Sequence, residues 1–367
     1  MSLSFEMILS LGAQLANPGL KNRPPRVAHV VCTESFAGVE RYVTVLSAAM
    51  ARAGWEVVIL GGDRQALLSH LQNAQVSWVP APTVCAAVVQ LRKLRPFDVV
   101  HAHMTDAEVA SVIAMLGTGV PVVCTRHFAQ PRGSSAIRRS VSALTARRIH
   151  TQIAISEFVS SRIEGVSTVI VPGVDNVDDI RPSAERDNQV LMAQRLEPEK
   201  RADLGIEAWA ASGLAAQGWT LVIAGEGSER RRLVALADEL GVGDSCRFLG
   251  FRSDVAELQR RAAIFLAPRP DEPLGLSVIE AMAAGAPVVA AGGGGHLETV
   301  GLHLAASLYP PFDVADAGRQ LAELASDPKR RDEYGRDLAT LQRLHLGVET
   351  QLAKTIDLYH RVTEETR

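Results

Sequence analysis

Short runs of β-branched residues alternate with longer Ala- and Leu-rich stretches along the chain, and this alternation constrains the fold more than any other feature. It is typical of βαβ units, in which helices cover both faces of a parallel sheet. We therefore predict an α/β protein with two Rossmann-like halves. The strands expected in the first half are residues 27–31, 56–60, 76–79, 98–102, 120–124, 151–155 and 168–171, and those in the second half are 190–193, 219–224, 246–248, 264–267 and 288–290.

A chain of 367 residues has room for two domains, each with its own core. Asp175–Gln189 is polar, with several acidic residues and a proline between two apolar runs, and we interpret it as an interdomain linker. We predict a first domain over residues 1–180, whose first 25 residues form an accessory segment, and a second domain over 181–347. Residues 348–367 should add a separate helix, with apolar side chains spaced to pack on a domain already built.

Composition excludes several classes of protein. The formal net charge is -3, with 16 Lys+Arg and 13 Asp+Glu in residues 1–180, so neither half has the basic excess of a nucleic-acid-binding domain. The four cysteines are far apart and form no zinc-binding motif, which favours a reduced protein. We find no convincing signal peptide or membrane anchor, and we expect a cytoplasmic protein, with peripheral association at the inner face of the membrane left open.

Function in such folds is sought just after each strand, because ligands bind at the carboxyl ends of parallel strands. In the first half, small residues around Gly38 lead into a helix whose N–H groups could receive a diphosphate or sugar, although an ordinary turn explains them equally well. His103 and His127 lie at the carboxyl ends of two further predicted strands. His101 and His103 share one face of their strand, but we see no third ligand nearby in the sequence and predict no metal site.

The second half carries different chemistry. Arg195 and Lys200 follow a strand and are suitable cations for two phosphates, the alternative being a solvated charge run. Gly225-Glu226-Gly227 allows close backbone approach but lacks the third glycine of a dinucleotide fingerprint, which disfavours a nicotinamide enzyme.

The most specific segment runs from Asp271 to Pro287. A helix should begin near Gly275 and end at Gly285, and Glu280 is its only charged residue. A carboxylate in such an apolar helix needs a partner, and ribose hydroxyls are good donors to it. Glu272 lies just before the helix, and the turn through Leu274, Gly275 and Leu276 offers N–H groups at the helix N-terminus.

The motifs A-G-V-E (37–40), D-V-V-H-A-H (98–103), T-R-H (125–127), R-L-x3-K (195–200), G-E-G (225–227), E-P-L-G-L-S-V-I-E-A (272–281) and G-G-x-x-E (294–298) occur in the order found in one family. In this the chain resembles the retaining, nucleotide-sugar-dependent glycosyltransferases of family 4. The resemblance begins near residue 26 and covers nearly all that follows. It implies a GT-B fold, with two Rossmann-like domains facing each other across a cleft and a C-terminal helix that crosses back to the first domain.

The resemblance also implies roles for individual residues. Glu280 would bind the ribose of the nucleotide, Glu272 the hydroxyls of the donor sugar, and Arg195 with Lys200 the diphosphate. His127 would contact the donor sugar, and the loop at Gly38 would face the diphosphate and the acceptor. The chain departs from the family at Ala37, where a glycine is usual, at 171–175, which lack an Asn-Gly pair, and at Arg269, where a serine is common.

We therefore expect an enzyme that transfers a sugar from a nucleotide diphosphate sugar, with UDP or GDP as its nucleotide, to a hydroxyl acceptor. The sugar would keep its anomeric configuration, and neither a cofactor nor a metal ion would be required. The family implies a front-side displacement in which the departing phosphate takes the acceptor proton. A sugar-nucleotide epimerase or phosphorylase, and a noncatalytic sugar-nucleotide-binding subunit, remain as alternatives.

The segment Arg126–Arg148 contains six arginines and no acidic residue, with apolar residues at helical spacing between them. We consider two interpretations. It is an electropositive surface for an anionic acceptor or anionic lipid headgroups, or it is an arginine-rich helix that packs its apolar stripe on the sheet and exposes its charges.

Overall fold

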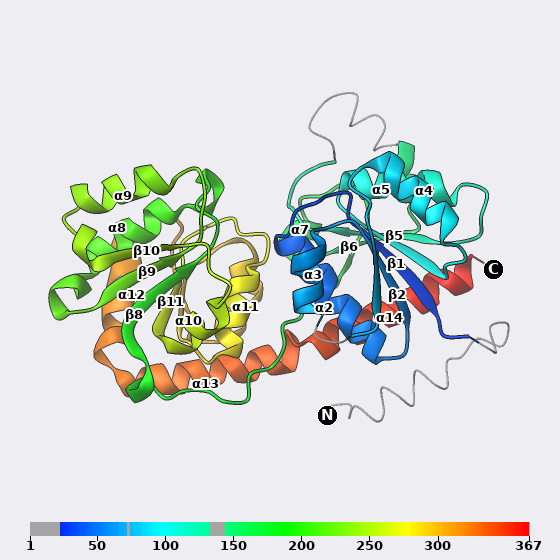
Figure 1. Cartoon of the computed structure of the whole chain (residues 1–367). Coiled ribbons are helices and arrows are strands. Elements are labelled where there is room, and N and C mark those ends of the chain that lie inside the picture. Colours follow the sequence, from blue (N-terminus) through cyan, green and yellow to red (C-terminus); the bar gives the residue numbers. More distant parts are fainter. Residues whose placement is uncertain (1–22, 72–73, 133–143, 367) are drawn as a thin grey trace. The chain divides into compact units, whose positions relative to one another are not determined.

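The computed structural model describes residues 23–71, 74–132 and 144–366 (Figure 1). The chain forms two compact units, one made of residues up to Gly173 together with Val348–Arg367, and the other of Val174–Gly347. Most of the accessory segment, residues 1–22, lies outside the described residues. The division at Gly173 comes seven positions before the expected boundary at residue 180.

The first unit contains a seven-stranded sheet in the order β3-β2-β1-β4-β5-β6-β7, in which every pair of neighbours is parallel. All its strands were expected from the sequence to within two residues at each end. They are β1 (Arg26–Val30), β2 (Glu56–Leu60), β3 (Val76–Val79), β4 (Val99–His103), β5 (Val122–Arg126), β6 (Thr151–Ala154) and β7 (Thr168–Val169).

Helices cover both faces of this sheet, as alternate strand residues require. One face packs against α2 (Gly38–Arg52), α3 (Arg64–His70) and the C-terminal helix α14 (Val348–Glu365). The other packs against α4 (Val84–Lys93) and α5 (Thr105–Met115). The short helix α7 (Glu157–Ser160) follows β6. The C-terminal segment therefore belongs to the core of the first unit.

The second unit has a six-stranded parallel sheet in the order β10-β9-β8-β11-β12-β13. Its strands are β8 (Asp187–Ala193), β9 (Thr220–Ala224), β10 (Cys246–Gly250), β11 (Ala262–Ala267), β12 (Val288–Ala291) and β13 (Ser307–Tyr309). Its α-helices are α8 (Ala202–Ser212), α9 (Arg230–Glu239), α10 (Val255–Arg261), α11 (Leu276–Ala283), α12 (Val314–Ser326) and α13 (Pro328–His345). The edge strand β13 was not expected from the sequence.

The two sheets confirm the prediction of an α/β protein with two Rossmann-like domains. In each unit, the central strands are almost completely buried, which explains why they read as continuous apolar runs. Within the part of the chain that the structure describes, no helix is both long and apolar enough to span a bilayer.

Candidate active site

Lys200 and Glu272 form an ion pair at the carboxyl edge of the second unit's sheet. Lys200 follows β8 in the short 3-10 helix Pro198–Lys200, and its Nζ donates to Glu272 Oε1 at 3.0 Å and Oε2 at 2.8 Å. Glu272 follows β11, the strand next to β8 in the sheet. The two side chains are only 19% and 13% exposed, so solvent screens their attraction weakly. The sheet order thus joins two residues that are far apart in the sequence.

Arg269 adds a second positive charge to this site. Its Nη1 lies 3.7 Å from Glu272 Oε2, and its Nε donates to Asp271 Oδ1 at 3.1 Å. Burial alone would raise the pKa of Glu272, but the charges of Lys200 and Arg269 outweigh it, and that pKa is lowered. Glu272 therefore remains ionised at neutral pH.

The turn that follows Glu272 presents a helix N-terminus to the same site. Gly275 has φ +91°, a left-handed conformation that favours glycine, and α11 starts at Leu276. The first N–H groups of a helix have no acceptor within it, so this turn offers donors to an anion. The helix ends before Gly285, which has φ +65°, as expected from the sequence.

The glycine run after β12 packs directly against this turn. The N–H of Gly295 donates to the Glu272 carbonyl at 2.7 Å. A Cβ at Gly294 would lie 2.5 Å from that carbonyl oxygen, and one at Gly295 would lie 2.4 Å from Leu274 Cα. The missing side chains therefore let two loops at the sheet edge meet backbone to backbone.

A pocket opens at this edge, and several polar side chains that sequence reasoning did not place there contribute to its wall. Its polar lining residues are Gln194, Lys200, Arg269, Glu272, Ser277 and His296. His296 is buried, and its Nδ1 lies 3.0 Å from the Ala291 carbonyl, which requires a proton on Nδ1. Burial lowers the pKa of His296, so the neutral ring keeps a bare Nε2. Its position between two glycines and a leucine gave no chemical signal in the sequence.

The other candidate site residues of the second unit differ in how far they are exposed and in what they contact. Arg195 is 59% exposed and pairs with Glu199 at 2.7 Å. Glu280 lies within α11 and is partly buried. Gly225 and Gly227 pack against the loop after β8, where an added Cβ would lie 1.9 Å from the Gln194 carbonyl and 2.2 Å from that of Leu196. These two glycines therefore serve the packing of two loops.

In the first unit, His103 ends β4 and His127 follows β5, at the carboxyl edge of the sheet. Both are buried, with His127 8% exposed. The ring of Tyr42, on α2, meets the His127 ring edge-on at 4.9 Å between centroids. Gly38 begins α2, and a Cβ there would meet nothing within 4 Å, so the space beside it is open.

Of the two interpretations of Arg126–Arg148, one continuous electropositive surface finds no support among the arginines that the structure describes. Arg126 and Arg132 are buried, and they pair with Glu164 at 3.3 Å and 2.9 Å. Arg132 also pairs with the buried Glu108. The chain then crosses from the carboxyl end of β5 to the amino end of β6, so Arg147 and Arg148 lie at the opposite edge of the sheet. Residues 133–143, with Arg138 and Arg139, lie outside the described residues.

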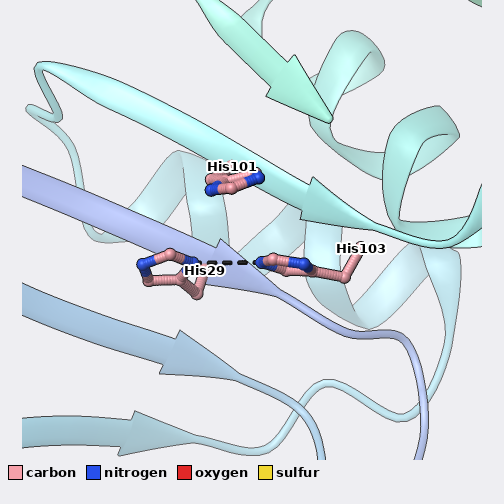
Figure 2. Close-up of side chains that lie close together, drawn as sticks. All are labelled: His29, His101 and His103. Carbon is pink, nitrogen blue, oxygen red and sulfur yellow. Dashed lines mark hydrogen bonds between the residues drawn. The ribbon is translucent and has the colours of Figure 1, made fainter. Parts of the chain in front are cut away.

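Three buried histidines meet inside the first unit, which corrects the expectation that His101 and His103 have no third partner nearby (Figure 2). His29 on β1 is the cross-strand neighbour of His101 on β4, and one nitrogen of each of the three histidines lies within 4.8 Å of the others. Three imidazoles can bind a metal ion. Here both nitrogens of His101 are already used, by the Tyr359 hydroxyl at 2.6 Å and Thr125 Oγ1 at 2.7 Å.

Comparisons with known proteins agree with this geometry. The family model "Glycosyltransferase Family 4" matches residues 36–176, and "Glycosyl transferases group 1" matches 174–338. The chain is 28% identical to a glycogen synthase of Mycobacterium tuberculosis, over 87% of this chain and 89% of that protein. It is 24% identical to a 2-deoxystreptamine glucosyltransferase of Streptomyces kanamyceticus, over 88% and 89%.

Solved structures show the same fold. Anabaena Alr3699/HepE aligns with a TM-score of 0.75 and 20% identity over 90% of this chain and 98% of that one. A sucrose-phosphate synthase of Thermosynechococcus elongatus aligns with a TM-score of 0.73 and 21% identity over 93% and 100%. The two family matches meet where the structure divides the chain and together span 36–338. The chain therefore belongs to the group 1 and family 4 glycosyltransferases and is a glycosyltransferase of the GT-B fold.

Proposed function

We propose that this glycosyltransferase moves a sugar from a nucleotide diphosphate sugar to a hydroxyl acceptor, with retention of the anomeric configuration. The observation that carries the proposal is the pocket in which Lys200, Arg269 and Glu272 meet the N-terminus of α11. Lys200 and Arg269 lie beside helix N–H groups there, and these donors together suit the diphosphate of such a donor.

UDP or GDP is the nucleotide we expect on the donor. Alr3699/HepE has been solved in complex with UDP and with UDP-glucose, which favours UDP. We assign the ribose to Glu280 and the hydroxyls of the donor sugar to Glu272. Glu272 suits that role because an ionised carboxylate accepts hydrogen bonds from several hydroxyls.

The barrier to transfer lies in departure of the nucleoside diphosphate, on which negative charge develops as the sugar becomes oxocarbenium-like. Lys200 and the N–H groups of Gly275 and Leu276 are fixed before the reaction, so they stabilise that charge without reorganisation. Arg195, whose side chain is exposed, would add a further positive charge to the diphosphate. These side chains supply positive charge of the kind a divalent cation would otherwise supply, and we propose a metal-independent reaction in which the departing phosphate takes the acceptor proton.

The first unit would contribute His127 to the donor sugar and the open space beside Gly38 to the diphosphate and acceptor. We assign the acceptor only by class, as a hydroxyl compound. The similar proteins include a glycogen synthase, a 2-deoxystreptamine glucosyltransferase and a D-inositol 3-phosphate glycosyltransferase, which act on chemically unlike acceptors.

A product assay tests the proposal. The chain is incubated with UDP- and GDP-sugars and a panel of hydroxyl acceptors, and NMR of the products reports the anomeric configuration of the transferred sugar. We expect a glycoside with the donor's configuration and release of the nucleoside diphosphate. An inverted product would contradict retention, an altered sugar still bound to nucleotide would indicate an epimerase, and donor binding without any product would indicate a noncatalytic subunit.

A further inference from the structure

His127 is the outer member of a row of three buried histidines. Its Nε2 lies 3.1 Å from His103 Nδ1, and His103 Nε2 lies 3.0 Å from His29 Nδ1. Figure 2 shows the inner contact, between His29 on β1 and His103 on β4. Each contact joins the Nδ1 of one ring to the Nε2 of the next, so the row has one direction along its whole length.

All three rings are neutral at physiological pH. Burial lowers the pKa of His29 and of His127 to about 3, and burial, followed by the neighbouring histidines, lowers that of His103 well below its ordinary value. A neutral imidazole carries one proton, on Nδ1 or on Nε2. The neighbouring rings bring no permanent charge that would favour a cation in the row. Tyr42 and His101 lie against His103, and Tyr359 lies against His101.

Only two arrangements of three protons satisfy both hydrogen bonds. Either every ring is protonated on Nδ1, and each donates outward towards His127, or every ring is protonated on Nε2, and each donates inward towards His29. Any mixture places two lone pairs, or two N–H groups, against each other. The protonation of His127 is therefore tied to that of His29 through His103.

The inner end of the row distinguishes the two arrangements. Nε2 of His29 is buried and has no hydrogen-bond partner. In the inward arrangement this atom would be an N–H without an acceptor, and in the outward arrangement it is a bare lone pair. Orphaned buried N–H groups are rarer in proteins than under-satisfied buried acceptors, which favours the outward arrangement.

We propose that His103 and His29 are positioning residues that hold His127 as the Nδ1–H tautomer, so that His127 offers a hydrogen-bond donor at the carboxyl edge of the first unit. The claim that the Nδ1–H group of His127 binds the sugar of the substrate rests on the proposed function, whereas the tautomer itself does not. A ring in this state donates to a hydroxyl oxygen through Nδ1, and its Nε2 is occupied by His103. No proton transfer at His127 is then part of the reaction.

The same hydrogen bonds argue against a metal ion among these histidines. Both nitrogens of His103 and both of His101 are already hydrogen-bonded, so a metal held by His29, His101 and His103 would have to displace at least one hydrogen bond of each of these two rings. We therefore interpret these histidines as hydrogen-bond donors and acceptors to one another.

Nitrogen NMR of the protein labelled with ¹⁵N-histidine tests the tautomer without substrate. The protonated and bare nitrogens of a neutral imidazole resonate far apart, and a His127→Gln variant identifies the His127 signals. We expect a protonated Nδ1 and a bare Nε2 on His127. A proton on Nε2, or a fast mixture of the two tautomers, would overturn the proposal even if the enzyme transfers sugar as expected.

Two substitutions at the far end of the row test the coupling. The amide of His29→Gln can still donate to His103, so His127 should keep its Nδ1 proton. His29→Met removes the donor to His103 Nε2 and offers only a weak acceptor, so His127 should lose its strict preference for Nδ1 and populate both tautomers. The control is His101→Gln, which changes a neighbouring buried histidine outside the row and should leave the His127 signals in place.

Activity supplies the second measurement on the same variants. If the enzyme is active, His29→Met should lower kcat/KM for the donor by up to about tenfold, the scale of one hydrogen bond, and His29→Gln should largely restore it. A wild-type tautomer in folded His29→Met would refute the positioning role. If His29→Met does not fold, the spectra of the wild type and of His29→Gln still decide the proposal. If the chain transfers no sugar at all, the proposed function fails while the tautomer measurement stands.

Discussion

Mild acid should destabilise the first unit much more than the second, because the first unit buries four histidines on one side of one sheet. Burial lowers the pKa of His29, His101, His103 and His127. In the unfolded chain each would titrate near its ordinary value, about 6.5. Since the folded pKa is the lower one, the unfolded state binds more protons as the pH falls, and stability is lost below about pH 6.5.

The size of the effect follows from the same linkage. Between pH 7 and pH 5.5, an unfolded histidine with a pKa of about 6.5 gains about 1.2 kcal/mol from protonation, while its folded counterpart stays neutral. Four such residues together lower the free energy of unfolding by about 5 kcal/mol. That loss is comparable with the whole stability of many domains, about 5–15 kcal/mol. In the second unit His296 is buried in the same way, so a loss nearer 1 kcal/mol is expected there.

Hydrogen exchange read by mass spectrometry at pH 7 and 5.5, corrected for the intrinsic pH dependence of exchange, separates the two units. Peptides from β1 and β4 should lose several kcal/mol of protection, and those from β8 and β11 should lose little. In His101→Gln the loss in the first unit should shrink by about 1.2 kcal/mol, whereas His345→Gln, at an exposed position on α13, serves as the control and should change nothing. Equal losses in both units, or an unchanged loss in His101→Gln, would refute the reasoning.

Three further outcomes are expected. Met104, directly after His103, has φ 73° and ψ 162°, a region almost restricted to glycine. Met104→Gly should therefore be more stable than Met104→Ala by about 1 kcal/mol or more in denaturant unfolding. A Met104→Ala variant that is the more stable of the two would contradict this strain. Glu280→Ala should leave the fold intact and weaken binding of the nucleoside diphosphate by about tenfold or more in calorimetry, because a charged hydrogen-bond partner of the ribose is lost, and unchanged affinity would refute the assignment. Transfer activity should persist in excess EDTA, since side chains supply the positive charge, and loss restored by magnesium or manganese would contradict a metal-independent reaction.

The sequence predicts the elements of this fold well because each is fixed by neighbouring residues. The limits of α11 follow from Gly275 and Gly285, whose backbones adopt left-handed conformations at its two ends. The edge strand β13 escaped prediction because it has only three residues. The domain boundary was placed late because the acidic stretch after Val174 looked like a linker, whereas Val174 already pairs with Gly347 of the second unit.

The candidate site was predicted where a residue follows a strand and missed where a partner comes from a distant strand. Lys200 and Glu272 each stood out from their apolar surroundings, but their pairing depends on β8 and β11 being neighbours. His29 gave no signal because its partners on β4 are more than 70 positions away. Arg132 looked exposed because the acids that neutralise it, Glu108 and Glu164, lie outside the segment in which it was found.

The central claim, that Lys200 holds the diphosphate of the donor, is tested most directly by comparing two ligands on two proteins. Isothermal titration measures UDP and GDP, and the matching nucleosides, against the wild type and Lys200→Met, which keeps most of the unbranched side chain and removes its charge. The account predicts that Lys200→Met binds the nucleoside diphosphate at least about tenfold more weakly, since a charge-assisted contact to phosphate is lost, and binds the nucleoside as the wild type does. Unchanged affinity for the diphosphate, or an equal loss for diphosphate and nucleoside, would contradict it.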